Sequence, residues 1–325
     1  MVADPVPLPE VPALTPAQSD TLARLSAAPA DRPTFPADLR DRLRALLEGE
    51  LSGPATAIPD GTTLFVNKRA LAGVHGCEAR WQAEDEAGFT PSVPVVIGSV
   101  AHKAIELSIH GARPRDPGDL VDRALERLSG SERWMGDWLE RCDEDDRAEV
   151  RSAAIAKVAA FDEIWPTLER SWRPVTEASV RQDLLGRRIS LNGKVDISLG
   201  HPDGLTARKV IVDLKTGRFA LHHRDDLRFY ALVETLRIGT PPRAVATSYL
   251  ESGELHVEEV TEDMLATAVA RTVDGVERIV GLRFGGDEPV RRPSGGCRWC
   301  PLLEQCDVGR AHLDAPADTA AHWDA

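Results

Sequence analysis

Residues 210–217 read Val-Ile-Val-Asp-Leu-Lys-Thr-Gly and place an acidic and a basic side chain at the end of an apolar run. The β-branched residues predict a strand over 208–214. Side chains two positions apart in a strand lie on one face, so Asp213 and Lys215 are expected to project together. Such a carboxylate can bind Mg²⁺ or Mn²⁺, and the ammonium can orient water and offset charge on a phosphorane. Because Asp-x-Lys is a common tripeptide, the pair needs support from other residues.

Two more strands are expected immediately before this one. Residues 175–185 and 187–199 alternate as strands do and are separated by Gly186. Asp196 lies in the second of these strands and comes close to Asp213 if the neighbouring strands pair. Two carboxylates that converge on one point repel each other unless a cation lies between them.

A helix is expected over 100–110, because Ser99 is a good N-cap and Gly111 can stop the helix. His102 would then lie in the first turn, where the positive end of the helix dipole favours a neutral imidazole that can bind a metal. Glu106, four residues later, shares its face and is a candidate auxiliary group. A single helical histidine is usually an ordinary core or surface residue, but the nearby aspartates and lysine favour the functional interpretation.

The rest of the chain follows an α/β order. Residues 119–172 are expected to be helical, and 225–238 and 261–280 are expected to be helices on either side of a hairpin over 244–260. This order predicts a mixed central sheet flanked by helices, with a helical insertion and with the carboxylates on adjacent strands.

The N-terminal segment differs in composition, since residues 1–60 hold 10 of the 23 prolines and the first dozen residues are expected to be a flexible lead. A short amphipathic helix is predicted over 39–51. Its apolar face is expected to carry Leu39, Leu43, Leu46 and Leu47. We therefore divide the chain into a Pro-rich arm (1–60), a globular domain (61–307) and a polar tail (308–325).

Four of the five cysteines form a distinctive pattern. Cys297, Cys300 and Cys306 lie close together, and Cys77 stands 220 positions before the first of them. In a reducing cytosol metal ligation explains such a cluster better than disulfides do. Both Zn²⁺ and an iron–sulfur cluster accept cysteine ligands. Cys142 has no cysteine neighbour and is expected to be an ordinary thiol.

Taken in order, three motifs resemble those of the PD-(D/E)xK nucleases, in the RecB/AddAB-type branch. The motifs are Gly98-x3-His102-x3-Glu106, Gly193-x2-Asp196 and Asp213-x-Lys215-Thr216-Gly217, and the likeness covers residues 62 to 307. The resemblance implies a restriction-endonuclease-like core in which His102, Asp196 and Asp213 bind Mg²⁺ or Mn²⁺ and Lys215 is the catalytic lysine.

A fourth motif departs from the branch. Asp226-x3-Tyr230 stands where a Gln-x3-Tyr is usual. A carboxylate cannot donate the hydrogen bonds of an amide and would repel a phosphate. Either Asp226 pairs with an arginine such as Arg224, or the substrate is handled differently. Tyr230 is a candidate catalytic residue and equally a core tyrosine.

The cysteine pattern resembles the iron–sulfur staple of AddB and of the CRISPR-associated adaptation nucleases, with one cysteine before the fold and three after it. The resemblance implies a [4Fe–4S] cluster held by Cys77, Cys297, Cys300 and Cys306, with Zn²⁺ as the alternative. Such a cluster would join the two flanks of the nuclease core.

The overall charge limits how the chain can act on nucleic acid. A net charge of −13 is unusual for a polyanion binder, although basic groups such as Arg187-Arg188 and Arg291-Arg292 can line one groove. The chain has no phosphate-binding loop of the Gly-x4-Gly-Lys-Ser/Thr type, so any unwinding would need a helicase or repair partner in trans. With no apolar run long enough to span a bilayer and no secretion signal, we expect a cytoplasmic protein that does not bind membranes.

These observations predict a metal-dependent deoxyribonuclease, a RecB-like exonuclease acting on single-stranded or end-containing DNA in repair, recombination or defence. Exonuclease against endonuclease action, and DNA against RNA, stay open. A non-catalytic nucleic-acid-binding or scaffold subunit of a helicase–nuclease complex is the main alternative, because the acidic charge and Asp226 suit binding without cleavage. A zinc-stapled interaction protein is a third possibility.

Overall fold

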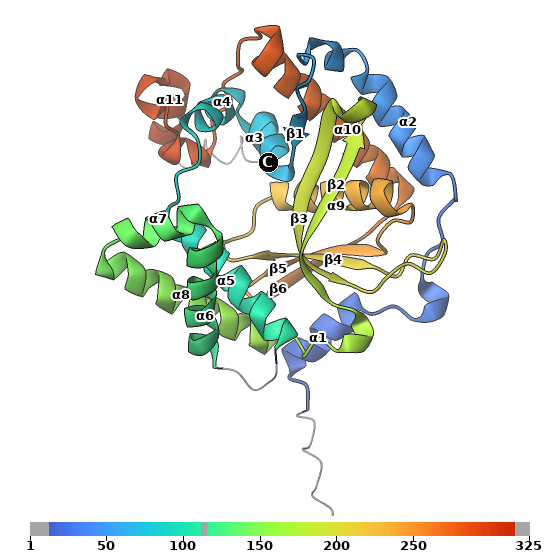
Figure 1. Ribbon diagram of the computed structural model, residues 1–325, viewed down its shortest axis with the longest axis vertical. Helices are drawn as coiled ribbons and strands as arrows, with labels where there is room; N and C mark the ends of the chain where they lie inside the picture. The colour runs from blue at the N-terminus through green and yellow to red at the C-terminus, as the bar shows by residue number, and fades with distance from the viewer. Residues whose placement is uncertain (1–12, 112–115, 316–325) are drawn as a thin grey trace, which may run out of the picture.

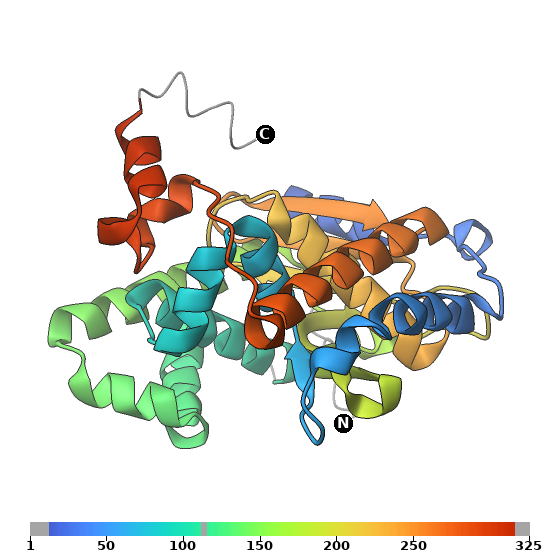
Figure 2. The same ribbon diagram turned by 90° about the horizontal axis from the view of Figure 1, so that it is seen from above.

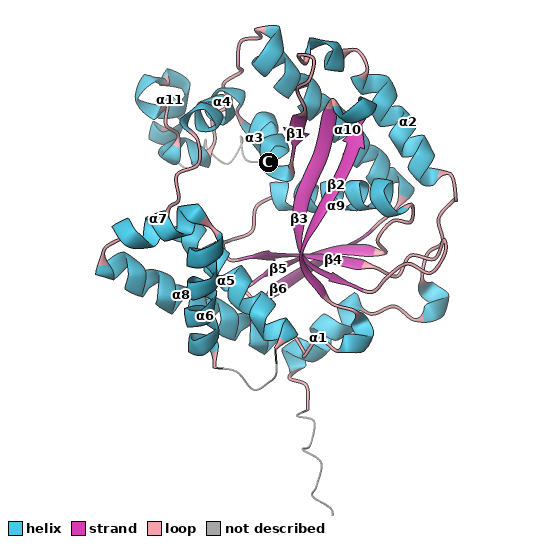
Figure 3. Ribbon diagram, viewed as in Figure 1, coloured by secondary structure: helices cyan, strands magenta, loops and turns pink. Residues whose placement is uncertain are grey.

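A computed structural model describes residues 13–111 and 116–315 of the 325-residue chain. Helices lie on both sides of a twisted six-stranded sheet (Figures 1 and 3). The expected α/β class and its mixed, helix-flanked sheet are therefore confirmed. The predicted flexible lead (1–12) and the end of the predicted tail (316–325) lie outside the described residues.

The sheet has the order β1-β3-β4-β5-β6, and β2 pairs with β3 as a hairpin. Its strands are β1 (Leu64–Val66), β2 (Val175–Leu184), β3 (Ile189–Leu199), β4 (Val210–Lys215), β5 (Ala244–Tyr249) and β6 (Glu254–Glu259). The β1–β3 and β4–β5 pairs are parallel, whereas β3–β4 and β5–β6 are antiparallel. The predicted meander and hairpin are confirmed, while the three-residue β1 was not foreseen.

Eleven α-helices appear in the described part of the chain. They are α1 (Pro16–Leu25), α2 (Leu39–Leu51), α3 (Lys68–Gly76), α4 (Glu78–Ala87), α5 (Val93–His110), α6 (Pro117–Ser131), α7 (Arg133–Arg141), α8 (Glu144–Ile164), α9 (His222–Ile238), α10 (Glu262–Val280) and α11 (Asp307–Asp314). None of the helices among these residues combines the length and the apolar character needed to cross a bilayer.

Two apolar cores lie on opposite faces of the sheet. One is built with α2, α3, α9 and α10. The other is built with α5, which carries His102, and with α6 to α8, which form the predicted helical insertion (Figure 1). Trp165, which follows α8, is fully buried and donates from Nε1 to Ser248 Oγ of β5 at 3.0 Å. The insertion is thus anchored to the sheet rather than hanging from it.

The predicted N-terminal helix exists with the expected bounds and packs on α10. Leu39, Leu43 and Leu47 are buried as predicted, but Leu46 is 52% exposed, and Leu51 completes the apolar face. The i, i+4 repeat explains the difference, since Leu46 is turned about 100° away from Leu47. At the other end, residues 307–314, where the predicted polar tail begins, form α11.

The helix that carries His102 begins earlier than predicted. It starts at Val93 with Ser92 as N-cap, and Pro94 lies in its first turn, where a missing N–H leaves no hydrogen bond unmade. Ser99 is therefore inside the helix and donates to Val95 O at 3.0 Å. His102 lies about two and a half turns along α5, so its expected place near the positive end of the helix dipole was wrong.

Candidate active site

Strands β3 and β4 separate at the point where the two aspartates lie. Their register ends at Ile197↔Val212, one residue before Asp196 and Asp213 would pair. In place of a backbone bond, Asp196 Oδ2 accepts a hydrogen bond from the Leu214 N–H at 2.7 Å. The side chain thus caps the open ladder, and it fixes Asp196 beside the end of β4.

Three ligand-type side chains gather around this opening. His102 Nδ1 lies 3.5 Å from Asp196 Oδ1 and 3.9 Å from Glu177 Oε1. Their ligand atoms all lie within 4.8 Å of one another, and in the two described stretches no other trio of His, Cys, Asp or Glu does so. Helix α5, β2 and β3 each contribute one group.

Glu177 occupies an unusual backbone conformation. Its φ is 51°, in the left-handed region that non-glycine residues rarely adopt. The β2–β3 register places it opposite Asp196, between the pairs Thr176↔Ile197 and Ala178↔Val195. Like charges directly opposite each other destabilise a sheet, and the strained backbone adds a cost of about 1–3 kcal/mol. Lys194 Nζ pairs with Glu177 Oε2 at 2.5 Å and so offsets part of this repulsion.

These carboxylates reverse the expected protonation of His102. Burial alone would lower the pKa of this imidazole, but the charges of Asp196, Glu177 and Asp213 and the hydrogen bond to Asp196 raise it to about 9. A metal ion binding here must therefore compete with a proton, contrary to the neutral imidazole predicted from the helix dipole.

Asp213 is buried between two lysines. The carboxylate is 1% exposed, and its Oδ1 accepts from Lys68 Nζ at 2.5 Å. Its Oδ2 makes no hydrogen bond and lies 2.9 Å from Lys215 Nζ in an ion pair without hydrogen-bond geometry. Burial alone would raise the pKa of Asp213, but the two ammonium groups lower it to about 2. Asp213 is thus an ionised carboxylate whose two oxygens each face an ammonium group.

Asp226 on α9 contacts the same lysine. Lys215 Nζ donates to Asp226 Oδ2 at 3.3 Å, so the suggested pairing with Arg224 is wrong; Arg224 pairs with Glu258 instead. Burial raises the pKa of Asp226, and the charge of Asp213 raises it further, while Lys215 and Lys68 lower it. Asp226, which stands where a glutamine is usual, thus places a second carboxylate beside Lys215.

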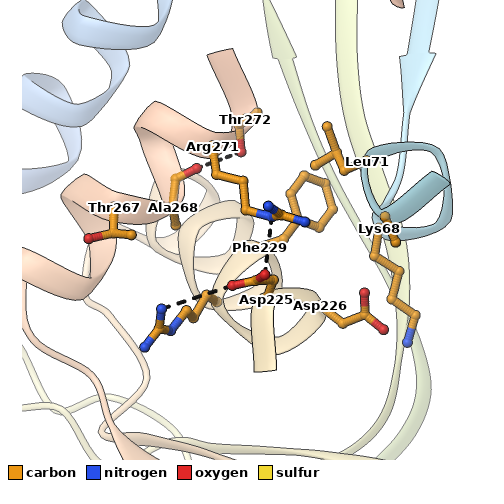
Figure 4. A pocket seen from close by; sticks show the side chains of 11 residues that line it. Lys68, Leu71, Asp225, Asp226, Phe229, Thr267, Ala268, Arg271 and Thr272 are labelled. Carbon is orange, nitrogen blue, oxygen red and sulfur yellow. Dashed lines mark hydrogen bonds and ion pairs between the residues drawn. The ribbon is translucent and has the colours of Figure 1, made fainter. Parts of the chain in front are cut away.

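A small cavity of about 10 Å³, room for about one water, lies behind this acid. Figure 4 shows Lys68 and Asp226 on one side of it, and Asp225 joined to Arg271 on the other.

Tyr230 holds backbone rather than facing the opening. Its hydroxyl donates to Lys194 O at 2.7 Å, and Lys68 Nζ lies 4.8 Å from the ring centroid. Burial raises the pKa of Tyr230 to about 12, so the hydroxyl keeps its proton. This geometry favours a structural role for Tyr230 in the core over a catalytic role.

Of the remaining expected residues, Glu106 is bound to Lys103 at 2.5 Å and stands outside the group of His102, Glu177 and Asp196. Sequence reasoning missed Glu177 and the role of Lys68. Glu177 could have been found from the hairpin register, which puts it opposite Asp196. Lys68 carried no comparable signal, since it was one basic residue among many.

We predict that Gly193→Ala will destabilise the protein by about 1–3 kcal/mol. An added Cβ would lie 2.4 Å from Tyr230 Cε1, so the ring that holds Lys194 must move. The free energy of unfolding in urea measures the loss. Gly130→Ala is the control, because its added methyl meets nothing within 4 Å. An equally small change in both variants would show that the ring moves freely.

The four predicted cysteine ligands come together at one end of the molecule. Cys77 lies at the start of α4, and the segment containing the other three and α11 packs beside it (Figures 1 and 2). All four line one small cavity. Backbone N–H groups of Arg292, Ser294 and Gly309 donate to Cys77, Cys297 and Cys306 Sγ at 3.4 Å each. Cys142 lies elsewhere and contacts Leu139 O.

The sulfur spacing differs from that of a single-ion site. No three of the four sulfurs lie within 4.8 Å of one another, whereas four sulfurs around one Zn²⁺ would be about 3.8 Å apart. Burial raises the pKa of Cys300, and the charges of Cys77 and Cys297 add to this while Arg80 lowers it. The Cys300 thiol therefore keeps its proton unless a cation binds the sulfur.

The chain was also compared with known proteins. Residues 69–307 match the family model described as the PD-(D/E)XK nuclease superfamily. No curated protein matches significantly. Among solved structures, one described as "Putative exonuclease" from Eubacterium rectale is 15% identical, with a TM-score of 0.49 and with 78% of this chain and 90% of that chain covered. Another, SSO0001, is 13% identical, with a TM-score of 0.35 and coverages of 81% and 95%.

Proposed function

This chain belongs to the PD-(D/E)XK nuclease superfamily, and on that premise we propose that it is a divalent-metal-dependent deoxyribonuclease, a RecB-like exonuclease acting in DNA repair, recombination or defence. The observation that carries the proposal is the group of His102, Glu177 and Asp196 beside the lysine-flanked Asp213. The carboxylate oxygens of Glu177 and Asp196 are the kind of ligand that Mg²⁺ and Mn²⁺ accept.

The residues fit a divalent cation. Glu177 and Asp196 face each other as like charges, and Asp213 Oδ2 is buried without a hydrogen bond. We infer that His102, Glu177 and Asp196 bind the metal, and that Asp213 joins them through Oδ2. A cation held there would neutralise charge on the scissile phosphate.

The other side chains orient the reactants. Lys215 is 17% exposed and is held between Asp213 and Asp226, where its ammonium can donate to an attacking water or to a phosphate oxygen. Lys68 donates to Asp213 Oδ1 and so keeps that carboxylate ionised and fixed. Asp226 would repel a phosphate group placed next to it. We therefore expect the enzyme to bind the end of a DNA strand rather than a run of phosphates along the strand.

We further propose that Cys77, Cys297, Cys300 and Cys306 hold a [4Fe–4S] cluster, with Zn²⁺ as the alternative. Their gathering around one cavity and the three N–H···S bonds support it. Glu78 links the same two segments, because it accepts from Arg278 at 2.6 Å and from the Val290 N–H at 2.9 Å. The cluster would thus reinforce an existing contact between the flanks of the core.

Matched substrates test the proposed activity. The anaerobically purified protein, with Mn²⁺ or Mg²⁺, is given linear single-stranded DNA, linear duplex, closed-circular single-stranded DNA and RNA of the same sequence. Shortening of the linear DNA with the circle and RNA spared is the expected result. Cutting of the circle would indicate an endonuclease, and cutting of RNA a broader substrate. No cutting by folded, metal-supplied protein would favour the non-catalytic nucleic-acid-binding or scaffold alternative, including a subunit that needs a helicase partner.

Glu177→Gln should raise the Mn²⁺ concentration for half-maximal cleavage by about tenfold or more. Glutamine keeps the shape of the side chain but removes the charge opposite Asp196. Titration of the cleavage rate with Mn²⁺ measures the shift. Glu106→Gln is the matched control, because Glu106 pairs with Lys103 outside the group. An equal shift in the control would assign Glu106 to the site instead.

A further inference from the structure

We propose that a second site, a cavity at the other end of β4 from the carboxylates, binds a small phosphate-bearing anion. The cavity has a volume of about 260 Å³. Its walls come from α1 and the segment after it, from the residues after α8, and from the ends of β3 and β4 and the start of β5. It therefore lies where the N-terminal arm meets the core.

The charge of the wall indicates an anionic ligand. Arg32, Arg208 and Arg243 line the cavity from three separate segments, and no acidic residue lines it. In the described residues neither Arg32 nor Arg243 has an ion pair within 4.0 Å, while Arg208 has one exposed contact with Asp203. On a chain of net charge −13, three arginines gathered without acids are a marked local excess of positive charge.

Arg243 is a buried guanidinium in the wall of the cavity. It is 7% exposed, and its guanidinium donates to Leu25 O at the end of α1. That contact uses one of five N–H donors, and a helix C-terminus offers only a partial negative charge. Burial lowers the pKa of Arg243, and Arg32 lowers it further against the opposing charge of Glu259. A buried guanidinium without a carboxylate is costly unless an anion pairs with it.

The size and the remaining wall narrow the ligand class. At about 260 Å³ the cavity is close to the lower limit of about 300 Å³ for ligand pockets. Ser26 and Ser171 supply hydroxyls, while Leu22 and Trp172 supply an apolar side. Inorganic phosphate or a nucleoside monophosphate fits this space, whereas an oligonucleotide does not.

The site is separate from the proposed nuclease centre. Val210 lines the cavity and Lys215 contacts Asp213, and the five residue steps from Val210 to Lys215 span roughly 16 Å of strand. A phosphate held by Arg32 of the arm and by Arg208 and Arg243 of the core would bridge the two. Binding should therefore fix the arm on the core, independently of cleavage.

Calorimetry in EDTA, with inorganic phosphate and with dAMP, tests the site without a metal at the nuclease centre. The parent should bind one anion per chain, and Arg32→Gln and Arg208→Gln should each weaken binding about tenfold. Hydrogen exchange over 16–25 should slow on binding. Arg24→Gln is the matched control, because Arg24 lies on α1 and pairs with Asp20 outside the cavity. Circular dichroism checks that every variant is folded.

Binding that survives Lys215→Ala and fails in the two arginine variants supports the proposal. Tighter binding of dAMP than of phosphate would identify a nucleotide site, and equal binding a site for the phosphate group alone. No binding of either probe, or binding lost in Lys215→Ala and kept in Arg208→Gln, would overturn it.

Discussion

Asp213→Asn is expected to reduce the rate of DNA cleavage by roughly a thousandfold. The carboxylate lies between Lys68 and Lys215, and its Oδ2 is the buried oxygen that lacks a hydrogen bond. An amide in its place carries no charge to hold either ammonium, and its N–H₂ group faces one of them. Cleavage of labelled linear DNA under metal saturation measures the loss.

Stability has to be measured beside activity in this variant. Removing one member of a buried ion pair typically costs about 3–5 kcal/mol, because the remaining charges are left uncompensated. Asp225→Asn is the matched control. Asp225 is also an aspartate in an ion pair, but it pairs with Arg271 away from the opening between β3 and β4. A folded Asp213→Asn protein that still cuts at the parent's rate would exclude Asp213 from the chemistry. Loss of activity in both variants would point to general damage.

The fold and much of the site could be predicted because local patterns determine them. Alternation along β2, β3 and β4 specifies a meander, and a meander brings Asp196 beside Asp213. The spacing of two puts Asp213 and Lys215 on one face, as the 2.9 Å ion pair reflects. The start of α5 could not be read in the same way, since Pro94 usually marks an extended segment and here lies in a first turn.

The missed residues depend on tertiary geometry. Glu177 lies opposite Asp196 in the β2–β3 hairpin, and its left-handed φ within a strand is not signalled by any periodicity in a non-glycine residue. Lys68 reaches Asp213 across 145 positions of sequence. The predicted pairing of Asp226 with Arg224 was wrong because it was based on nearness in sequence. In the fold Arg224 pairs with Glu258 on β6.

Cys300→Ser should remove most of the bound iron and lower the midpoint of thermal unfolding by up to roughly 10 °C. A crosslink between Cys77 and Cys297 closes a loop of 220 residues, and chain entropy gives roughly 5 kcal/mol for such a loop. The contacts of Glu78 with Arg278 and Val290 already join the two segments, so the loss should fall below that limit. Metal analysis, absorbance at about 400 nm and a thermal melt measure the change.

Cys142→Ser provides the control for this test, because Cys142 is a partly buried cysteine whose sulfur contacts Leu139 and Arg147 in the insertion. It should keep its iron, its colour and its melting temperature. About four iron atoms per chain in the parent, lost in Cys300→Ser and kept in Cys142→Ser, would support the cluster. One zinc per chain would identify the alternative metal. If the parent protein binds no metal and has the same melting temperature as Cys300→Ser, a metal crosslink between the two segments is ruled out. The contacts of Glu78 would then be the main link between them.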